Sequence, residues 1–121
     1  MQKVGFQIYA ELYDCNPNKL SRIENVREIF LEVIRSAKLT ILKEIFHQFN
    51  PHGVTGNLIL SESHANIHTW PEHKYVSVDI FTCDGEGEEK SKKAIQMLKE
   101  RFGAKRIFIK EFHRGIVPEK E

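Results

Sequence analysis

Residues 54–83 read VTGNLILSESHANIHTWPEHKYVSVDIFTC, and this stretch decides the fold. Residues 75–83 alternate in polarity and are rich in β-branched and aromatic side chains, which predicts a strand. Residues 54–61 and 65–69 have a similar strand character. Successive strands with short connections between them indicate hairpins, and therefore a mainly antiparallel sheet.

Two amphipathic helices flank this stretch. Between Ser21 and Ala37 the apolar residues Ile23, Val26, Phe30, Val33 and Ile34 recur at helical spacing with charged residues between them. From Lys90 to Phe102 the inward positions are Ala94, Ile95, Leu98 and Phe102, and Gly103 ends the helix. Further strands are expected at residues 5–13, 40–49 and 106–112, followed by a polar, loose tail from Arg114.

The predicted order is β-α-β-β-β-β-α-β, which indicates an α+β fold. Both helices are expected on one face of a mainly antiparallel sheet. The other face of the sheet then needs cover, and a second copy of the chain is the economical way to supply it. The length of 121 residues fits one domain spanning residues 1–121.

Composition excludes several function classes. The chain is 40% hydrophobic and 29% charged, as in a globular protein, and its net charge is +1. Basic residues are interleaved with acidic ones, so a nucleic-acid partner is not expected. Apolar runs are far too short for a membrane span, and the expected location is cytoplasmic. Cys15 and Cys83 lie far apart and are expected to be free thiols.

Potentially reactive side chains concentrate between residues 47 and 83, and the densest piece is residues 61–73, SESHANIHTWPEH. Four of the six histidines of the chain fall between His52 and His73. A solvated turn that happens to carry serine, glutamate and histidine is the simplest interpretation. The residue types also permit three kinds of chemistry, and their spacing selects none of them.

One possibility is a metal site, in which His64 and His68 share a face of an extended segment and His113 or Glu72 completes the ligand set. A second is a hydrolase triad of Ser63, His68 and Asp79, although no G-x-S-x-G motif is present. A third is a nucleophilic Cys83, which ends a strand; a small buried hydrophobic residue is the competing interpretation.

Residues 61–72, SESHANIHTWPE, resemble the self-processing segment of prokaryotic S-adenosylmethionine decarboxylases of the short bacterial and archaeal type. The resemblance runs from about Gly5 to His113. It includes AELYDC near the start, FHQFNPHGVTG before the segment and YVSVDIFTC after it. The combination of ESH, IHTWPE and DIFTC at this spacing is a specific signal, although subfamilies with other substrates share it.

The resemblance implies that the chain cuts itself between Glu62 and Ser63, giving a β chain of residues 1–62 and an α chain of residues 63–121. The hydroxyl of Ser63 would attack the Glu62 carbonyl in an N-to-O acyl shift. Loss of the α-proton of Ser63 and hydrolysis would then leave a covalent pyruvoyl cofactor. This group would form a Schiff base with the substrate and replace pyridoxal phosphate as the electron sink.

The resemblance also assigns roles to individual residues. His68 matches the base that removes the α-proton in processing, and Cys83 matches the acid that reprotonates the substrate. Phe49 aligns with an aromatic residue that stacks on adenine, and Glu72 with a carboxylate that binds the ribose hydroxyls. Thr55 stands where the family usually has a serine that polarises the scissile carbonyl; threonine keeps the hydroxyl but has a stiffer side chain. No metal is implied.

The family's site lies between two protomers. Ser63 and Cys83 would come from one subunit, and Phe49, Thr55, His68 and Glu72 from the other. The homodimer would pack two sheets face to face as an αββα sandwich. The implied reaction is decarboxylation of S-adenosylmethionine for spermidine biosynthesis. Alternatives are a pyruvoyl-dependent arginine or ornithine decarboxylase, and a non-processing homologue that acts as a binding or regulatory subunit.

Overall fold

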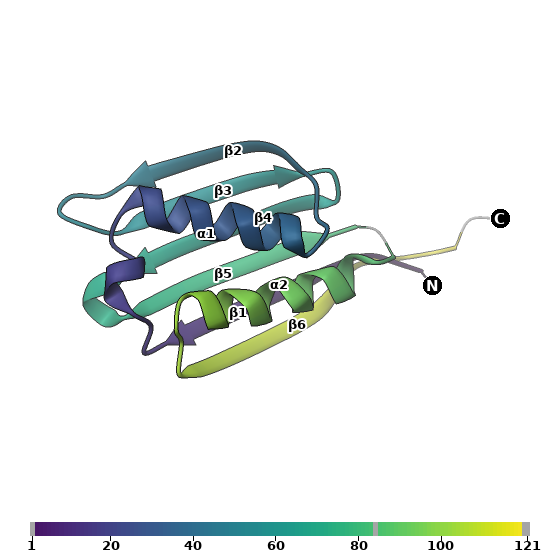
Figure 1. Ribbon diagram of the computed structural model, residues 1–121. Helices are drawn as coiled ribbons and strands as arrows, with labels where there is room; N and C mark the ends of the chain where they lie inside the picture. The colour runs from purple at the N-terminus through teal and green to yellow at the C-terminus, as the bar shows by residue number, and fades with distance from the viewer. Residues whose placement is uncertain (1, 84, 120–121) are drawn as a thin grey trace.

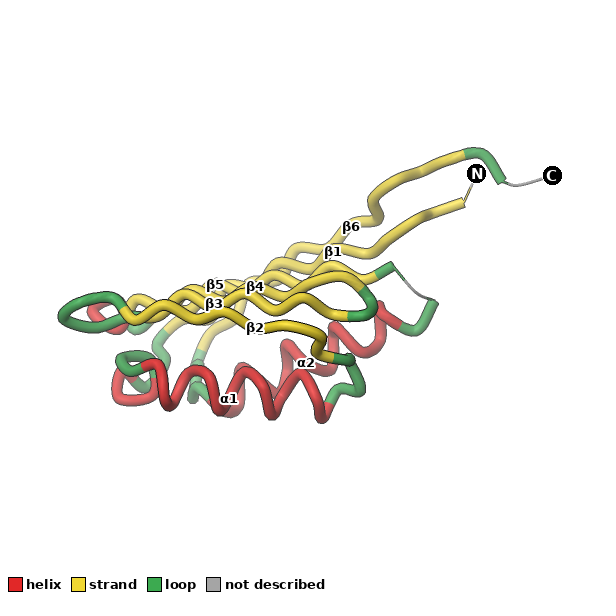
Figure 2. Tube along the Cα trace, turned by 90° about the horizontal axis from the view of Figure 1, so that it is seen from above, coloured by secondary structure: helices red, strands yellow, loops and turns green. Residues whose placement is uncertain are grey.

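The computed structural model describes residues 2–83 and 85–119. It contains one six-stranded sheet with two helices on one side, so the predicted α+β class is confirmed (Figures 1 and 2). The strands are β1 (Gln2–Tyr13), β2 (Ile41–Gln48), β3 (Val54–Leu60), β4 (Ser63–Trp70), β5 (Tyr75–Thr82) and β6 (Arg106–Val117). The helices are α1 (Ile23–Ser36) and α2 (Gly87–Arg101), with short 3₁₀ turns η1 (Pro17–Lys19) and η2 (Pro71–His73).

The strand order is β2-β3-β4-β5-β1-β6, and every neighbouring pair is antiparallel. Hairpins account for the pairs from β2 to β5. The pairing of β1 with β5 and with β6 joins the two ends of the chain at one side of the sheet, as Figure 1 shows. The predicted element order is therefore correct, and the tertiary structure adds that β1 lies between β5 and β6.

The core lies between the helices and the face of the sheet that they cover (Figure 2). On α1 the predicted inward residues Val26, Phe30, Val33 and Ile34 are fully buried, and Ile23 is partly buried. On the second helix Ala94, Ile95, Leu98 and Phe102 are all fully buried, as predicted. Alternate residues of β3, β4 and β5 complete this layer.

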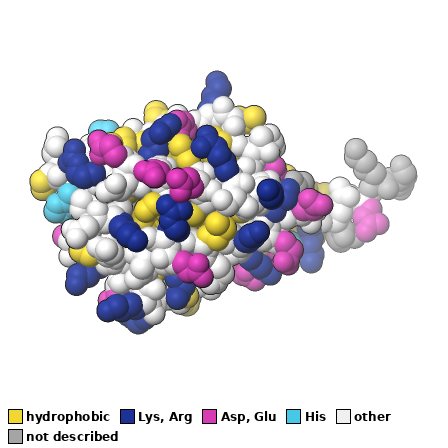
Figure 3. All heavy atoms as spheres, in the orientation of Figure 1, with side chains coloured by type: hydrophobic (Ala, Val, Ile, Leu, Met, Phe, Trp, Pro, Cys, Tyr) yellow, Lys and Arg dark blue, Asp and Glu magenta, His cyan; other side chains and the backbone are white. Residues whose placement is uncertain are grey.

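The opposite face of the sheet, here called the open face, carries no helix (Figure 2). Strand alternation places Thr55, His68, Ser77 and Glu11 on it. Large apolar side chains are exposed there too, among them Tyr9, Ile45, Ile59 and Trp70. Figure 3, by contrast, shows the helical side covered by interspersed acidic and basic side chains. In the described part of the chain, no helix is long and apolar enough to cross a membrane.

Several predicted boundaries differ from the structure, among them two strand ends. The tail after Arg114 is not loose, because β6 continues to Val117 and pairs with the start of β1 from Gln2 to Phe6. The strand expected at residues 65–69 begins earlier, at Ser63, since Ser63 pairs with both Leu60 and Thr82. Neither extension continues a regular alternation of apolar and polar side chains, and backbone pairing at a strand end does not require one.

Candidate active site

Ser63 is the first residue of β4, directly after the Ser61–Glu62 turn that joins β3 to β4. The turn is held by two bonds to Thr40, whose carbonyl accepts from the Ser61 amide at 2.9 Å and whose amide donates to Glu62 Oε1 at 3.0 Å. Ser63 has a φ of 153°, which residues with a side chain rarely adopt. Backbone strain of about 1–3 kcal/mol is therefore concentrated at this residue.

The carbonyl of Glu62 accepts a hydrogen bond from the backbone amide of Cys83 at 2.8 Å. A donor in this position stabilises negative charge on the carbonyl oxygen, which is what addition of a nucleophile to this carbonyl would create. The structure thus brings together Ser63, the carbonyl that its hydroxyl is expected to attack, and Cys83. Ser63 and Cys83 are 20 positions apart in the sequence but close in space, because β4 and β5 are paired.

Cys83 follows β5 and is exposed, so the sequence-based alternative of a buried structural cysteine is wrong for this residue. It lines a hollow of about 160 Å³ together with Gly5, Phe6 and His113. Cys15 is buried, and both cysteines are free thiols as predicted. An exposed thiol beside the strained serine can act as an acid or a nucleophile without rearrangement of the core.

His68 and Thr55 lie directly opposite each other on β4 and β3. Thr55 Oγ1 is 3.1 Å from His68 Nδ1, so one hydrogen bond orients the imidazole ring. The threonine hydroxyl therefore reaches the histidine that the resemblance assigns as base. The extra methyl group of threonine does not prevent this contact.

A second hollow, of about 310 Å³, opens beside this pair. Phe49, Thr55, His68 and Glu72 all line it, together with Trp70 and the turn at residues 50–53. Phe49 is 46% exposed, so its ring is not part of the core and is accessible from the hollow. Aromatic rings and a carboxylate around one cavity suit a ligand that has an aromatic base and hydroxyl groups.

His52 and Trp70 also line this hollow, and neither was assigned a role from sequence. His52 Nε2 lies 3.3 Å from Glu72 Oε1, which ties the carboxylate to the neighbouring turn. Trp70 stacks on Tyr75 with ring centroids 5.2 Å apart. Burial, strengthened by a hydrogen bond to Glu11, raises the pKa of Tyr75 to about 12, so this ring stays neutral. The cluster of histidines near residue 52 was the only sequence signal for His52.

The two groups of residues lie at opposite ends of β4. Ser63 and His68 are five positions apart on one strand, which corresponds to about 16 Å. Within one chain, therefore, His68 cannot reach the α-proton of Ser63. Ser63 and Cys83 therefore lie together at the start of β4, whereas Phe49, Thr55, His68 and Glu72 gather around the hollow near its other end.

The same geometry rules out a Ser63–His68–Asp79 triad within one chain. Asp79 lies opposite Asn66 and accepts a hydrogen bond from its side chain at 3.2 Å. His64 shares the open face with His68, as the metal hypothesis required, but its imidazole lies 4.0 Å from Asp79. His68 instead contacts Thr55 and the ring of Trp70.

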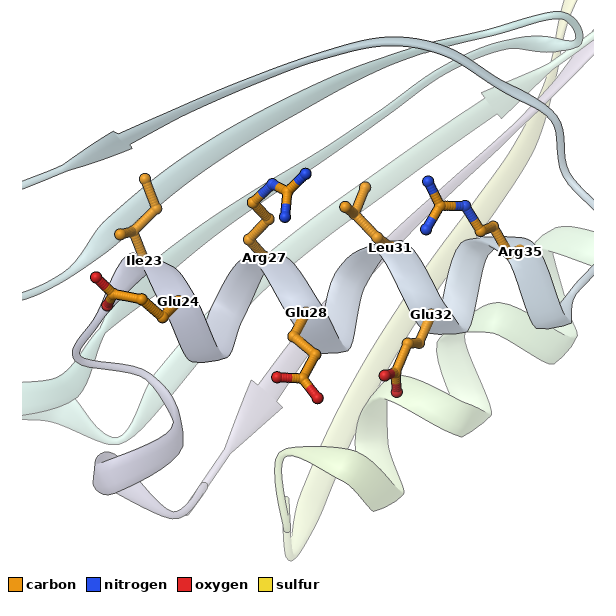
Figure 4. Close-up of a pocket in the computed structure, with 7 residues that line it drawn as sticks. All are labelled: Ile23, Glu24, Arg27, Glu28, Leu31, Glu32 and Arg35. Carbon is orange, nitrogen blue, oxygen red and sulfur yellow. The ribbon is translucent and has the colours of Figure 1, made fainter.

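A larger hollow, of about 440 Å³, lies on the outer side of α1 (Figure 4). Figure 4 shows Glu24, Glu28 and Glu32 along one side of the helix, and Arg27 and Arg35 with two apolar residues along the other. Arg27 pairs with Glu44 of β2, and Glu32 pairs with Arg101 of α2. This is a charged, solvated helix surface that joins neighbouring elements, and it contains no nucleophile.

Comparisons with known proteins point to one family. A family model described as S-adenosylmethionine decarboxylase matches residues 6–115. The chain is 44% identical over 115 residues to an S-adenosylmethionine decarboxylase proenzyme of Persephonella marina, covering 95% of this chain and 85% of that protein. It is 43% identical over 115 residues to the S-adenosylmethionine decarboxylase proenzyme of Sulfurihydrogenibium sp., again covering 95% of this chain and 85% of that protein.

A solved structure is also similar. The crystal structure of the adenosylmethionine decarboxylase from Aquifex aeolicus superposes with a TM-score of 0.91 at 36% sequence identity. The match covers 100% of this chain and 98% of that chain. The resemblance noted in the sequence therefore extends to the whole fold.

Proposed function

Because the chain belongs to the S-adenosylmethionine decarboxylase family, we propose that it is a self-processing, pyruvoyl-dependent decarboxylase. Its substrate is S-adenosylmethionine, and its products are CO₂ and decarboxylated S-adenosylmethionine for spermidine biosynthesis, in the cytoplasm. The observation that carries this proposal is the strained Ser63 next to a hydrogen-bonded Glu62 carbonyl, within a chain whose residues 6–115 match the family.

Self-processing begins at the bond between Glu62 and Ser63. Ser63 Oγ attacks the Glu62 carbonyl carbon, its proton passes to the nitrogen of residue 63, and the C–N bond breaks to leave an ester. A base removes the α-proton of residue 63, and the Glu62 carboxylate departs. Hydrolysis releases ammonia and leaves the pyruvoyl group on the chain of residues 63–121, with residues 1–62 as the second chain.

The residues present fit this cofactor. Ser63 supplies the oxygen on Cβ, and the Cys83 amide is already bonded to the carbonyl under attack. The pyruvoyl group would supply a carbonyl that accepts the electrons released as CO₂ leaves. Cys83, exposed beside it, would return a proton to the substrate carbon.

The second half of the site comes from a partner copy of the chain. Because His68 is about 16 Å from Ser63 along β4, the base must be supplied by another molecule. The exposed apolar side chains of the open face support a homodimer in which two sheets pack face to face as an αββα sandwich. Each dimer then contains two complete sites.

In each complete site the partner's hollow would hold the nucleoside. Phe49 would stack on the adenine, Glu72 would accept hydrogen bonds from the ribose hydroxyls, and Thr55 would hold His68 in place. Ornithine has no planar group to stack on Phe49, whereas an arginine guanidinium can stack on an aromatic ring and pair with a carboxylate. Only S-adenosylmethionine has both an aromatic base for Phe49 and a diol for Glu72, and together with the family match this favours it as the substrate.

Denaturing mass spectrometry of the purified protein tests self-processing. We expect two fragments, residues 1–62 and 63–121, and a carbonyl-trapping reagent should label only the second. Ser63→Ala should remain one intact chain, whereas Ser61→Ala, in the same turn, should cleave normally. A single intact species after long incubation of the unaltered protein would instead indicate a non-processing homologue.

The substrate is tested separately by release of labelled CO₂. Processed protein should release CO₂ from carboxyl-labelled S-adenosylmethionine and not from arginine or ornithine. Release from arginine alone would contradict the proposed substrate while leaving the pyruvoyl chemistry intact.

A further inference from the structure

Two buried hydroxyl groups lack a hydrogen-bond partner within residues 2–83 and 85–119, Thr82 Oγ1 and Ser91 Oγ. Both side chains are 0% exposed. The buried Thr69 differs, because its hydroxyl donates to the Leu20 carbonyl at 2.7 Å and accepts from the Val54 amide at 2.9 Å. A buried hydroxyl without a partner destabilises the folded state, so its presence calls for a functional explanation.

Thr82 is the direct cross-strand partner of Ser63. Residues that face each other across antiparallel strands project from the same face with Cβ atoms about 4.5–5.5 Å apart. Rotation about the χ1 angles can bring two hydroxyl oxygens at that separation to hydrogen-bond distance. Gly87 of α2 packs directly against the Thr82 side chain, since a Cβ atom added to Gly87 would lie 2.2 Å from Thr82 Oγ1.

The next residue, Cys83, donates its amide to the Glu62 carbonyl. Thr82, the last residue of β5, therefore lies beside Ser63, and Cys83, the next residue, binds the Glu62 carbonyl. These are the two groups that must react. Ser91 follows Gly87 by one helical turn and lies opposite neither group. Only one of the two unpartnered hydroxyls is thus beside the expected cleavage site.

We propose that Thr82 is a positioning residue for self-cleavage, whose hydroxyl accepts a hydrogen bond from the hydroxyl of Ser63. This inference rests on the proposed self-processing of the chain. The bond selects the Ser63 rotamer that directs Oγ toward the Glu62 carbonyl carbon, while the Cys83 amide holds the carbonyl oxygen. The step itself is unchanged: the Oγ–C bond forms, the C–N bond breaks, and the Ser63 proton moves to the nitrogen.

This role predicts opposite effects on stability and on cleavage. Thr82→Val keeps the shape of the side chain and removes the unpartnered hydroxyl, so it should raise the melting temperature. The same change removes the acceptor for Ser63, so it should slow cleavage by about tenfold, the effect of losing one hydrogen bond in the transition state. A purely structural role for Thr82 would move both quantities in the same direction.

The test follows the cleavage of freshly made precursor over time by denaturing mass spectrometry. Thr82→Val is compared with Thr82→Ser, which retains the hydroxyl, and with Ser91→Ala, which removes the other unpartnered hydroxyl. Melting temperatures are measured in a Ser63→Ala background, so that every sample is one uncleaved chain. We expect slow cleavage for Thr82→Val only, and higher melting temperatures for both Thr82→Val and Ser91→Ala.

The possible outcomes separate the two proposals. Cleavage of Thr82→Val at the unaltered rate would refute the positioning role and leave self-processing in place. Equal slowing by Ser91→Ala would refute it too, because the effect would then come from the buried layer in general. Absence of cleavage in the unaltered chain would refute self-processing itself.

Discussion

Thr55 shows how a single side chain can depart from a family pattern and keep its contact. Its hydroxyl lies 3.1 Å from His68 Nδ1, the distance of an ordinary hydrogen bond. Thr55→Ser preserves this oxygen and removes only a methyl group, so we predict cleavage at least as fast as in the unaltered chain. Thr55→Val removes the oxygen and should slow cleavage by about tenfold.

Cleavage half-times from denaturing gels would measure both changes. Slower cleavage of Thr55→Ser would mean that the site has adapted to threonine. An unaltered rate in Thr55→Val would show that His68 needs no orienting hydroxyl.

Cys15 should make stability depend on alkaline pH. Burial raises the pKa of its thiol from 9.0 to about 11, and the nearby Asp14 charge adds to the effect. Between these two pKa values the unfolded chain loses the thiol proton and the folded chain keeps it. The contribution of the protonated Cys15 thiol to the free energy of unfolding is therefore fully present below pH 9. It is lost as the pH rises through 11, by about 2–3 kcal/mol.

Urea unfolding of Ser63→Ala protein between pH 8 and about 11.5 would measure this loss. Other groups also titrate in that range, so the informative quantity is the difference from a Cys15→Ala variant. The variant should lose less stability over the same pH interval. Equal losses would contradict a raised pKa for Cys15.

At the scale of elements, the C-terminal end of β6 should contribute to stability, although the sequence predicted a loose tail there. Gly115 has a φ of 69°, and a Cβ atom there would come within 2.8 Å of Val4 Cβ. Gly115→Ala should therefore cost about 1–2 kcal/mol of unfolding free energy. Thermal unfolding checks this, with Gly85→Ala as the matched control, because nothing lies within 4 Å of its Cβ position.

Hydrogen exchange gives an independent measurement of the same element. Amides of residues 113–117 that pair with the start of β1 should be protected in the unaltered chain and less protected in Gly115→Ala. Rapid exchange in the unaltered chain would support the loose tail that the sequence predicted.

At the scale of the whole molecule, the two half-sites predict complementation between inactive chains. His68→Ala keeps Ser63 but lacks the base, and Ser63→Ala keeps the base but lacks the serine. In a mixed dimer, the His68→Ala chain meets the intact His68 of its partner and should cleave. With random pairing of equal amounts, about half of the His68→Ala chains should be cut.

Co-expression with distinguishable tags, followed by mass spectrometry, would show which chain is cut. Each variant expressed alone should stay intact. Rapid cleavage of His68→Ala alone would mean that the base lies in the same chain, with His64 as the nearest candidate on β4.

The sequence by itself determined the order of the elements, the inward faces of both helices and the segment that carries the chemistry. These features are local: the spacing of apolar residues sets which side of a helix or strand is buried, as Val26 and Phe30 on α1 illustrate. It also predicted that one sheet face needs cover. Resemblance then added the residue roles, which no spacing could supply.

Only the tertiary structure decided which residues are neighbours across strands. The β4–β5 register brings Thr82 to Ser63 and Cys83 to Glu62, while the length of β4 keeps His68 away from Ser63. Register and strand order depend on contacts between residues distant in the sequence, so local periodicity cannot specify them. For the same reason the sequence could place Thr82 in a strand, but could not show that its hydroxyl is buried without a partner beside Ser63.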